Sequence, residues 1–165
     1  MLSVIFYAWA RPIEITRLTI GEFELSLELI RFKKGKTKNG EASYVQIVPP
    51  LKELIKKLNL QQYPGHYKVF SDNFQPGVRQ VSKHYALKFW KKWVKDKQGI
   101  NKDMYSLKHT GNIEYLLNNK ENINLKWQQM QNRHSSATIT ERYNRKLGAY
   151  FIEVGNLNFR QFIWK

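Results

Sequence analysis

The helical spacing of apolar residues in the second half of the chain is the strongest constraint on its fold. Between Val81 and Lys97, lysines occupy the polar faces of a helical pattern and apolar residues share the remaining face. That face consists of Tyr85, Ala86, Phe89, Trp90 and Trp93. A regular aromatic stripe is more typical of a hydrophobic core than of a surface on which nucleic-acid bases stack. We therefore expect a helix here whose aromatic face is buried.

Helical patterns also occur on both sides of this segment. Residues 2–10 are apolar, and Pro12 suits the first turn of a second helix, so two short helices are expected to meet near Arg11. After Pro49 and Pro50, residues 51–58 form an amphipathic pattern. Three more helices are expected at residues 106–118, 124–132 and 136–147.

Strand patterns are confined to the first half. Residues 23–32 alternate apolar and polar, residues 44–48 are rich in strand formers, and a basic hairpin tip at 33–40 joins them. The connecting loop 63–78 has room for one short strand around Val69. The sequence therefore predicts a mainly α (α+β) domain, with a helical core and a small three-stranded antiparallel sheet at one edge.

Length and charge limit the number of domains and the kind of partner. A chain of 165 residues is long enough for one domain with a proper core. Lys and Arg outnumber Asp and Glu by 28 to 13, and a net charge of +15 favours a polyanionic partner, nucleic acid first. A membrane surface is second, but the apolar run 2–10 is shorter than the ~20 residues that span a bilayer, and no secretion signal is recognisable.

Residue usage also narrows the chemistry. The chain has no cysteine, which excludes disulfides, thiolate nucleophiles and Cys-based zinc sites and is compatible with a reducing cytoplasm. Its four histidines show no pairing at i and i+4, so we expect no metal site. We expect a cytoplasmic protein.

Several residues are suited to binding and attacking a phosphate, because they supply cations, imidazoles and a hydroxyl. Each also has an ordinary structural alternative. Arg11 can form a salt bridge with Glu14, a hairpin lysine is usually solvated, and a single tyrosine is usually a packing residue. The set must therefore be judged jointly. Its members are Arg11, Lys38, Tyr105, Lys108, His109, His134 and Tyr143.

The order of these residues resembles the catalytic domain of the tyrosine recombinases, also called phage integrases. The resemblance covers about residues 5–147. Each segment alone is a weak signal, whereas the ordered set is specific. The matching segments are Arg11-Pro-Ile-Glu, the hairpin lysine Lys38 or its neighbour Lys36, Tyr105-Ser-Leu-Lys-His-Thr, Arg133-His-Ser-Ser and Thr-Glu-Arg-Tyr143.

The resemblance implies site-specific DNA strand exchange that needs no cofactor. Tyr143 would attack the scissile phosphate, form a 3′-phosphotyrosyl intermediate and release a 5′-hydroxyl. Lys38 would protonate the leaving oxygen, and His109 would support the site. The residues implied to hold the phosphate are Arg11, Tyr105, Lys108 and His134. Those expected to contact DNA nearby are Lys34, Lys36, Arg133, Arg142 and Arg145.

The family also sets expectations for assembly. The partner would be double-stranded DNA attachment sites, bound by a homotetramer in the synaptic complex, with a monomer free in solution. Residues 1–165 would form a single catalytic domain without the amino-terminal domain that clamps the other face of the DNA. Residues 148–165 would be a tail that docks on a neighbouring protomer.

Three positions depart from the family pattern. Lys108 replaces an arginine, Tyr105 replaces a histidine and Arg133 replaces a glycine. Lysine keeps the charge but lacks the guanidinium fork, and tyrosine is a poor proton carrier near neutral pH. Three alternatives therefore remain: a DNA-binding remnant that no longer cleaves, a type IB topoisomerase with the same intermediate, and a basic nucleic-acid-binding module whose match is coincidental.

Overall fold

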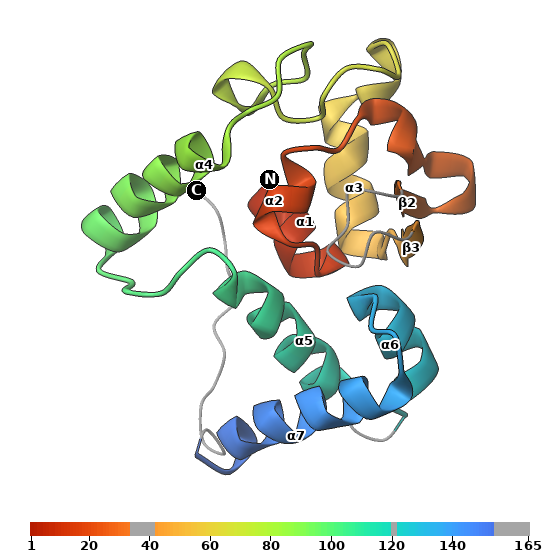
Figure 1. Ribbon diagram of the computed structural model, residues 1–165, viewed down its shortest axis with the longest axis vertical. Coiled ribbons are helices and arrows are strands. Elements are labelled where there is room, and N and C mark those ends of the chain that lie inside the picture. Colours follow the sequence, from red (N-terminus) through yellow and green to blue (C-terminus); the bar gives the residue numbers. More distant parts are fainter. Residues whose placement is uncertain (34–41, 120–121, 154–165) are drawn as a thin grey trace.

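The computed structural model describes residues 1–33, 42–119 and 122–153. Within these ranges the chain forms seven α-helices and one three-stranded sheet (Figure 1). The predicted fold class, mainly helical with a small antiparallel sheet, is confirmed. No helix in the described ranges is long and apolar enough to cross a lipid bilayer.

The first half of the chain combines the sheet with three helices. The sheet is antiparallel in the order β1-β2-β3, and Ile30 on the central strand lies opposite Phe23 and Val45. All three side chains are buried in the main core, which also includes Ile5 of α1 and Leu51 of α3. The elements are α1 (Leu2–Ala8), α2 (Pro12–Ile15), β1 (Phe23–Glu24), β2 (Leu29–Phe32), β3 (Ser43–Gln46) and α3 (Pro49–Leu58).

The second half is helical, and side-chain caps begin three of its helices. Ser82, Asn124 and Ser136 each accept a hydrogen bond from a backbone N–H three residues later, which satisfies a donor that the first helical turn leaves unpaired. The elements are α4 (Lys83–Trp90), its π-helical continuation Lys91–Asp96, α5 (Ser106–Asn118), α6 (Leu125–Asn132) and α7 (Ala137–Glu153).

Helices α5 and α6 attach the lower part of the molecule in Figure 1 to the part that contains the sheet. The buried side chain of Gln131 on α6 accepts from the backbone N–H of Gln46 and donates to the carbonyl of the same residue. α5 packs on α1 at Gly111, where a Cβ would lie 2.0 Å from the backbone oxygen of Phe6. The two helices can approach this closely only because position 111 has no side chain.

The expected helices at 106–118, 124–132 and 136–147 are present, although the last continues to Glu153. The part of the predicted tail at 154–165 lies outside the described residues.

The single strand predicted at 23–32 is wrong. A 3-10 turn at Leu25–Leu27 and the left-handed backbone of Glu28, with φ 55°, reverse the chain between β1 and β2. The apolar alternation gave the wrong prediction because Leu27, one of its apolar residues, is 64% exposed. No strand forms around Val69 either; its neighbour Lys68 makes only isolated bridges to Thr19 and Gly77. Residues 23–32 therefore form two strands, β1 and β2, and β3 completes the three-stranded sheet.

The prediction that the aromatic face of α4 is buried is only partly correct. Ala86 and Trp90 are buried, and the indole N–H of Trp90 donates to the carbonyl of Lys102. Tyr85, Phe89 and Trp93 are 41%, 44% and 38% exposed. The buried residues Ala86 and Trp90 form one stripe, and the exposed aromatic residues form a second stripe one position away along the helix. Only one of these two stripes can face the core directly. The exposed aromatic residues contact other side chains. Phe74 packs against Tyr85 and Phe89. Lys97 lies over the ring of Trp93.

We expect Gly111→Ala to lower the free energy of unfolding by about 1–3 kcal/mol, because the new methyl group would force α5 away from α1. Urea denaturation measures the change. Gly65→Ala is the matched control, since a Cβ there would be 3.5 Å from its nearest neighbour, an ordinary contact. Equal effects of the two substitutions would show that the α1–α5 approach does not limit stability.

Candidate active site

The start of α5 places three of the predicted residues together. Tyr105 occupies the N-cap position of α5, and Lys108 and His109 follow three and four residues later, so all three lie on neighbouring parts of one helical surface. The rings of Tyr105 and His109 meet edge to face with centroids 4.9 Å apart. Tyr105 and His109 are partly exposed, whereas Lys108 is 1% exposed.

Arg11 lies at the start of α2 and is held by Glu14. One carboxylate oxygen of Glu14 accepts from the backbone N–H of Arg11 at 2.8 Å, and the other accepts from its guanidinium at 2.8 Å. The salt bridge weighed as an ordinary alternative is therefore present. It does not conceal the arginine, because 23% of the Arg11 side chain remains exposed. The pairing fixes the direction of the guanidinium.

Arg133 occupies an unusual backbone position at the end of α6. Its φ of 57° is left-handed, a conformation that costs a non-glycine residue about 1 kcal/mol. Its guanidinium donates at 2.7 Å to the Glu14 oxygen that also accepts from the backbone N–H of Arg11. It stacks 4.2 Å from the ring centre of Phe32. The side chain is only 5% exposed, so Arg133 is buried beside Glu14.

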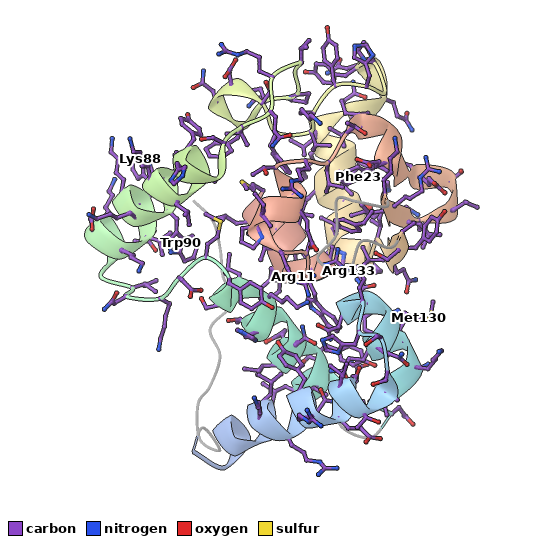
Figure 2. All side chains as sticks on the ribbon, in the orientation of Figure 1. Arg11, Phe23, Lys88, Trp90, Met130 and Arg133 are labelled. Atoms are coloured by element: carbon purple, nitrogen blue, oxygen red, sulfur yellow. The ribbon has the colours of Figure 1, made fainter. Side chains whose placement is uncertain are left out.

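Glu14 therefore joins two arginines that are far apart in sequence. Figure 2 shows Arg11 and Arg133 side by side. Burial alone would raise the pKa of the Glu14 carboxyl, but Arg133, Arg11 and the backbone hydrogen bond outweigh it and lower that pKa. The carboxylate is ionised near neutral pH and is the acidic partner of both guanidinium groups.

Lys108 adds a third cation beside this pair. Its ammonium donates to the carbonyl of Asn132 at 3.4 Å, a long hydrogen bond. Burial, followed by repulsion from Arg133 and Arg11, lowers the pKa of Lys108 to about 7. Lys108 is therefore only partly protonated near neutral pH, and a bound anion would favour its charged form.

His134 follows Arg133 directly in the chain. Its Nδ1 lies 3.0 Å from the hydroxyl of Thr140 on α7. Burial, then the charges of Lys108, Arg11 and Arg133, lower the pKa of His134 to about 4, so its imidazole is neutral near neutral pH. An imidazole whose Nδ1 accepts from the threonine carries its proton on Nε2 and can donate it to an anion.

Tyr143 on α7 reaches back to α5. Its hydroxyl lies 2.6 Å from Nδ1 of His109, and its ring is 5.6 Å from that of His134. Burial and the neighbouring Tyr105 raise the pKa of Tyr143. Burial and Lys108 lower the pKa of His109. A protonated phenol therefore faces a neutral imidazole, the arrangement in which histidine can accept the proton of a nucleophile.

Five sequence candidates remain, and two of them lie in the described part of the chain. Arg142 and Arg145 are exposed on α7. Lys34, Lys36 and Lys38 lie outside the described residues. No group of three or more His, Cys, Asp or Glu residues in the described ranges is arranged to hold a metal ion.

A pocket of about 410 Å³ lies between the 3-10 turn Leu25–Leu27 and α3, and none of the candidate residues lines it. The candidate site is instead defined by its charged and hydrogen-bonded side chains.

Sequence reasoning did not assign three contacts of this site. These contacts are the bond from Arg133 to Glu14, the contact of His134 with the hydroxyl of Thr140, and the bond from Lys108 to the carbonyl of Asn132. No local sequence pattern predicts them. The only available signal was the glycine expected at position 133, because a glycine at the end of a helix commonly indicates left-handed backbone.

The comparisons with known proteins support the fold. No family model matches the sequence, and no curated protein matches it. A solved structure titled "Crystal structure of XerA recombinase" superposes with a TM-score of 0.64 at 18% sequence identity. The superposition covers 95% of this chain but 57% of the recombinase chain. The chain shares the fold of that part of the recombinase.

We expect the free energy of unfolding to rise by about 1–2 kcal/mol between pH 8 and 9.5. The folded pKa of Lys108 is about 7, below the unfolded value near ~10.4, so the unfolded chain binds more protons in this range and folding gains stability as pH rises. Urea denaturation at each pH measures the slope.

Lys108→Met should remove this rise, whereas Lys91→Met, at an exposed position after α4, should keep it. The range starts at pH 8 because the buried amino terminus, with its pKa lowered to about 5, contributes at lower pH. An unchanged slope in Lys108→Met would assign the effect to another group.

Proposed function

We propose that this chain is the catalytic domain of a site-specific DNA recombinase that cleaves and rejoins DNA through a 3′-phosphotyrosyl intermediate. The observation that carries the proposal is the 2.6 Å contact between the Tyr143 hydroxyl and His109, beside a cationic cluster and near His134. The shared fold with a structure titled as a recombinase supports it. The chain contributes a nucleophile, a base and phosphate-binding groups, and no cofactor enters the proposal.

The proposed cleavage step is an in-line displacement at phosphorus. The oxygen of Tyr143 attacks and its proton moves to Nδ1 of His109, while the bond between phosphorus and the 5′ oxygen of the next nucleotide breaks. The leaving oxygen takes a proton, for which Lys38 is the proposed donor. Rejoining reverses these steps when a 5′-hydroxyl attacks the phosphotyrosine, so the energy of the phosphodiester bond is conserved.

The phosphate-binding groups stabilise the charge that develops in this step. The non-bridging oxygens gain negative charge as the tyrosine attacks, and fixed donors in a partly buried site stabilise that charge more than water does. Arg11 is the exposed guanidinium of the cluster and Lys108 a buried ammonium. We assign phosphate binding to both, with His134 and Tyr105 as neutral donors.

The proposed partner is double-stranded DNA at specific attachment sites. The net charge of +15 suits a polyanion, and Arg142 and Arg145 are exposed on the helix that carries Tyr143. Because the chain spans 57% of the recombinase chain it superposes on, we propose that a separate domain clamps the opposite face of the DNA. We further propose a homotetramer on DNA, with the tail docking between protomers.

A DNA-binding remnant that no longer cleaves is the second candidate. It is favoured by the burial of Lys108 and by its low pKa, which leaves its charge incomplete near neutral pH. A remnant would bind DNA with a strong dependence on salt but would form no covalent product.

Incubation with a nicked suicide substrate of the attachment site distinguishes the two candidates. We expect a covalent protein–DNA adduct with the wild-type chain and none with Tyr143→Phe, because only the hydroxyl can attack phosphorus. Tyr85→Phe, an exposed tyrosine on α4, is the matched control and should keep the adduct. Retained DNA binding without any wild-type adduct would favour the remnant, and random relaxation of supercoiled DNA would favour a topoisomerase.

His109→Ala should slow adduct formation by roughly 10²–10⁴-fold, the usual contribution of a positioned proton acceptor. Single-turnover rates on the same suicide substrate measure the effect. His66→Ala serves as the control because His66 packs against Tyr67, away from the cluster. A rate within twofold of wild type would mean that His109 does not take the proton of Tyr143.

A further inference from the structure

The guanidinium of Arg133 has donors that the protein does not use. Its Nη2 bonds to Glu14, but Nε and Nη1 are buried and have no hydrogen-bond partner in the described part of the chain. Buried donors are almost always satisfied, and those of a charged group are the most costly to leave unpaired. The two unpaired donors therefore point to an acceptor supplied by a ligand.

The surrounding charge indicates the kind of ligand. Arg133, Arg11 and Lys108 form a buried or half-buried cationic group, and Glu14 is their shared carboxylate. The charge of each of the other two cations disfavours the protonated form of Lys108. A bound phosphate would neutralise this excess and accept the unused hydrogen bonds at once.

The backbone brings Arg133 to the same place as the other candidate ligands. The carbonyl of Asn132 accepts a hydrogen bond from the ammonium of Lys108, and His134 follows Arg133 in the chain. Residues 132–134 therefore present a contact to Lys108, a guanidinium and an imidazole in succession. The left-handed backbone at position 133 is what directs the chain in this way.

We propose that Arg133 is a phosphate ligand and supplies the guanidinium that α5 lacks because it carries Lys108 instead of an arginine. The proposal rests on the proposed function, in that the phosphate is the scissile group of DNA. Arg133 would hold that phosphate together with Arg11, from the end of α6 rather than from α5. The alternative is a positioning role, in which Arg133 only keeps Glu14 and Arg11 in place.

Binding of orthovanadate, a phosphate analogue, tests the ligand role without DNA. By calorimetry, we expect Arg133→Gly to weaken vanadate binding at least tenfold, because glycine suits the left-handed backbone and lacks the guanidinium. Arg79→Ala, at an exposed arginine that has no role in the proposed site, is the control and should change binding less than twofold.

Arg133→Lys separates charge from geometry. It keeps the positive charge and the partner for Glu14 but loses the fork, so binding should remain several-fold weaker than in the wild type. Unchanged vanadate affinity in a folded Arg133→Gly, or in Arg133→Lys if the glycine variant does not fold, would overturn the proposal. A wild-type chain that binds no vanadate would overturn it as well.

A double-variant cycle on the suicide substrate tests whether an arginine at position 108 can replace the guanidinium of Arg133. Lys108→Arg should rescue adduct formation in Arg133→Gly by at least tenfold and should have little effect in the wild type. An equal effect of Lys108→Arg in both backgrounds would show that positions 108 and 133 do not share a function. If the wild-type chain forms no adduct, the proposed function fails, whereas the vanadate comparison still decides the role of Arg133.

Discussion

The site depends on the buried carboxylate of Glu14. It pairs with Arg11 on its own helix and with Arg133, which is 119 residues away along the chain. These bonds hold the start of α2 against the end of α6, so the first and last parts of the described chain share one ionic contact. Removing a carboxylate of this kind leaves two buried or half-buried guanidinium groups without a negative partner. The resulting loss of folding stability exceeds the net stabilisation that the ion pairs provide.

The cluster around Glu14 stores electrostatic strain. Three cations lie around one carboxylate, and burial first, followed by the charges of these cations, lowers the pKa of Lys108 and of His134. Such an arrangement lowers the stability of the folded chain and raises its affinity for an anion. The left-handed backbone of Arg133 adds to the cost. Strain that is concentrated at a few residues, and that one ligand can relieve, is typical of a functional site.

The helices could be predicted because their evidence is local. Apolar spacing within ten to twenty residues located α5, α6 and the start of α7 closely. The errors arose where the same local pattern allows two outcomes. Alternation around Leu27 did not reveal the turn at Glu28, and the aromatic stripe of α4 did not reveal which of two adjacent faces meets the core. Burial depends on neighbouring elements that a local window does not contain.

The sequence by itself determined the mainly helical class, the basic character and the order of the candidate residues. It could not determine that Tyr143 meets His109, 34 residues earlier, or that Arg133 lies buried on Phe32 and Glu14 instead of on the surface. Those contacts join residues from different helices and strands. They exist only because α5 packs on α1 at Gly111 and α6 packs on β3, and the packing of distant elements is a property of the tertiary structure.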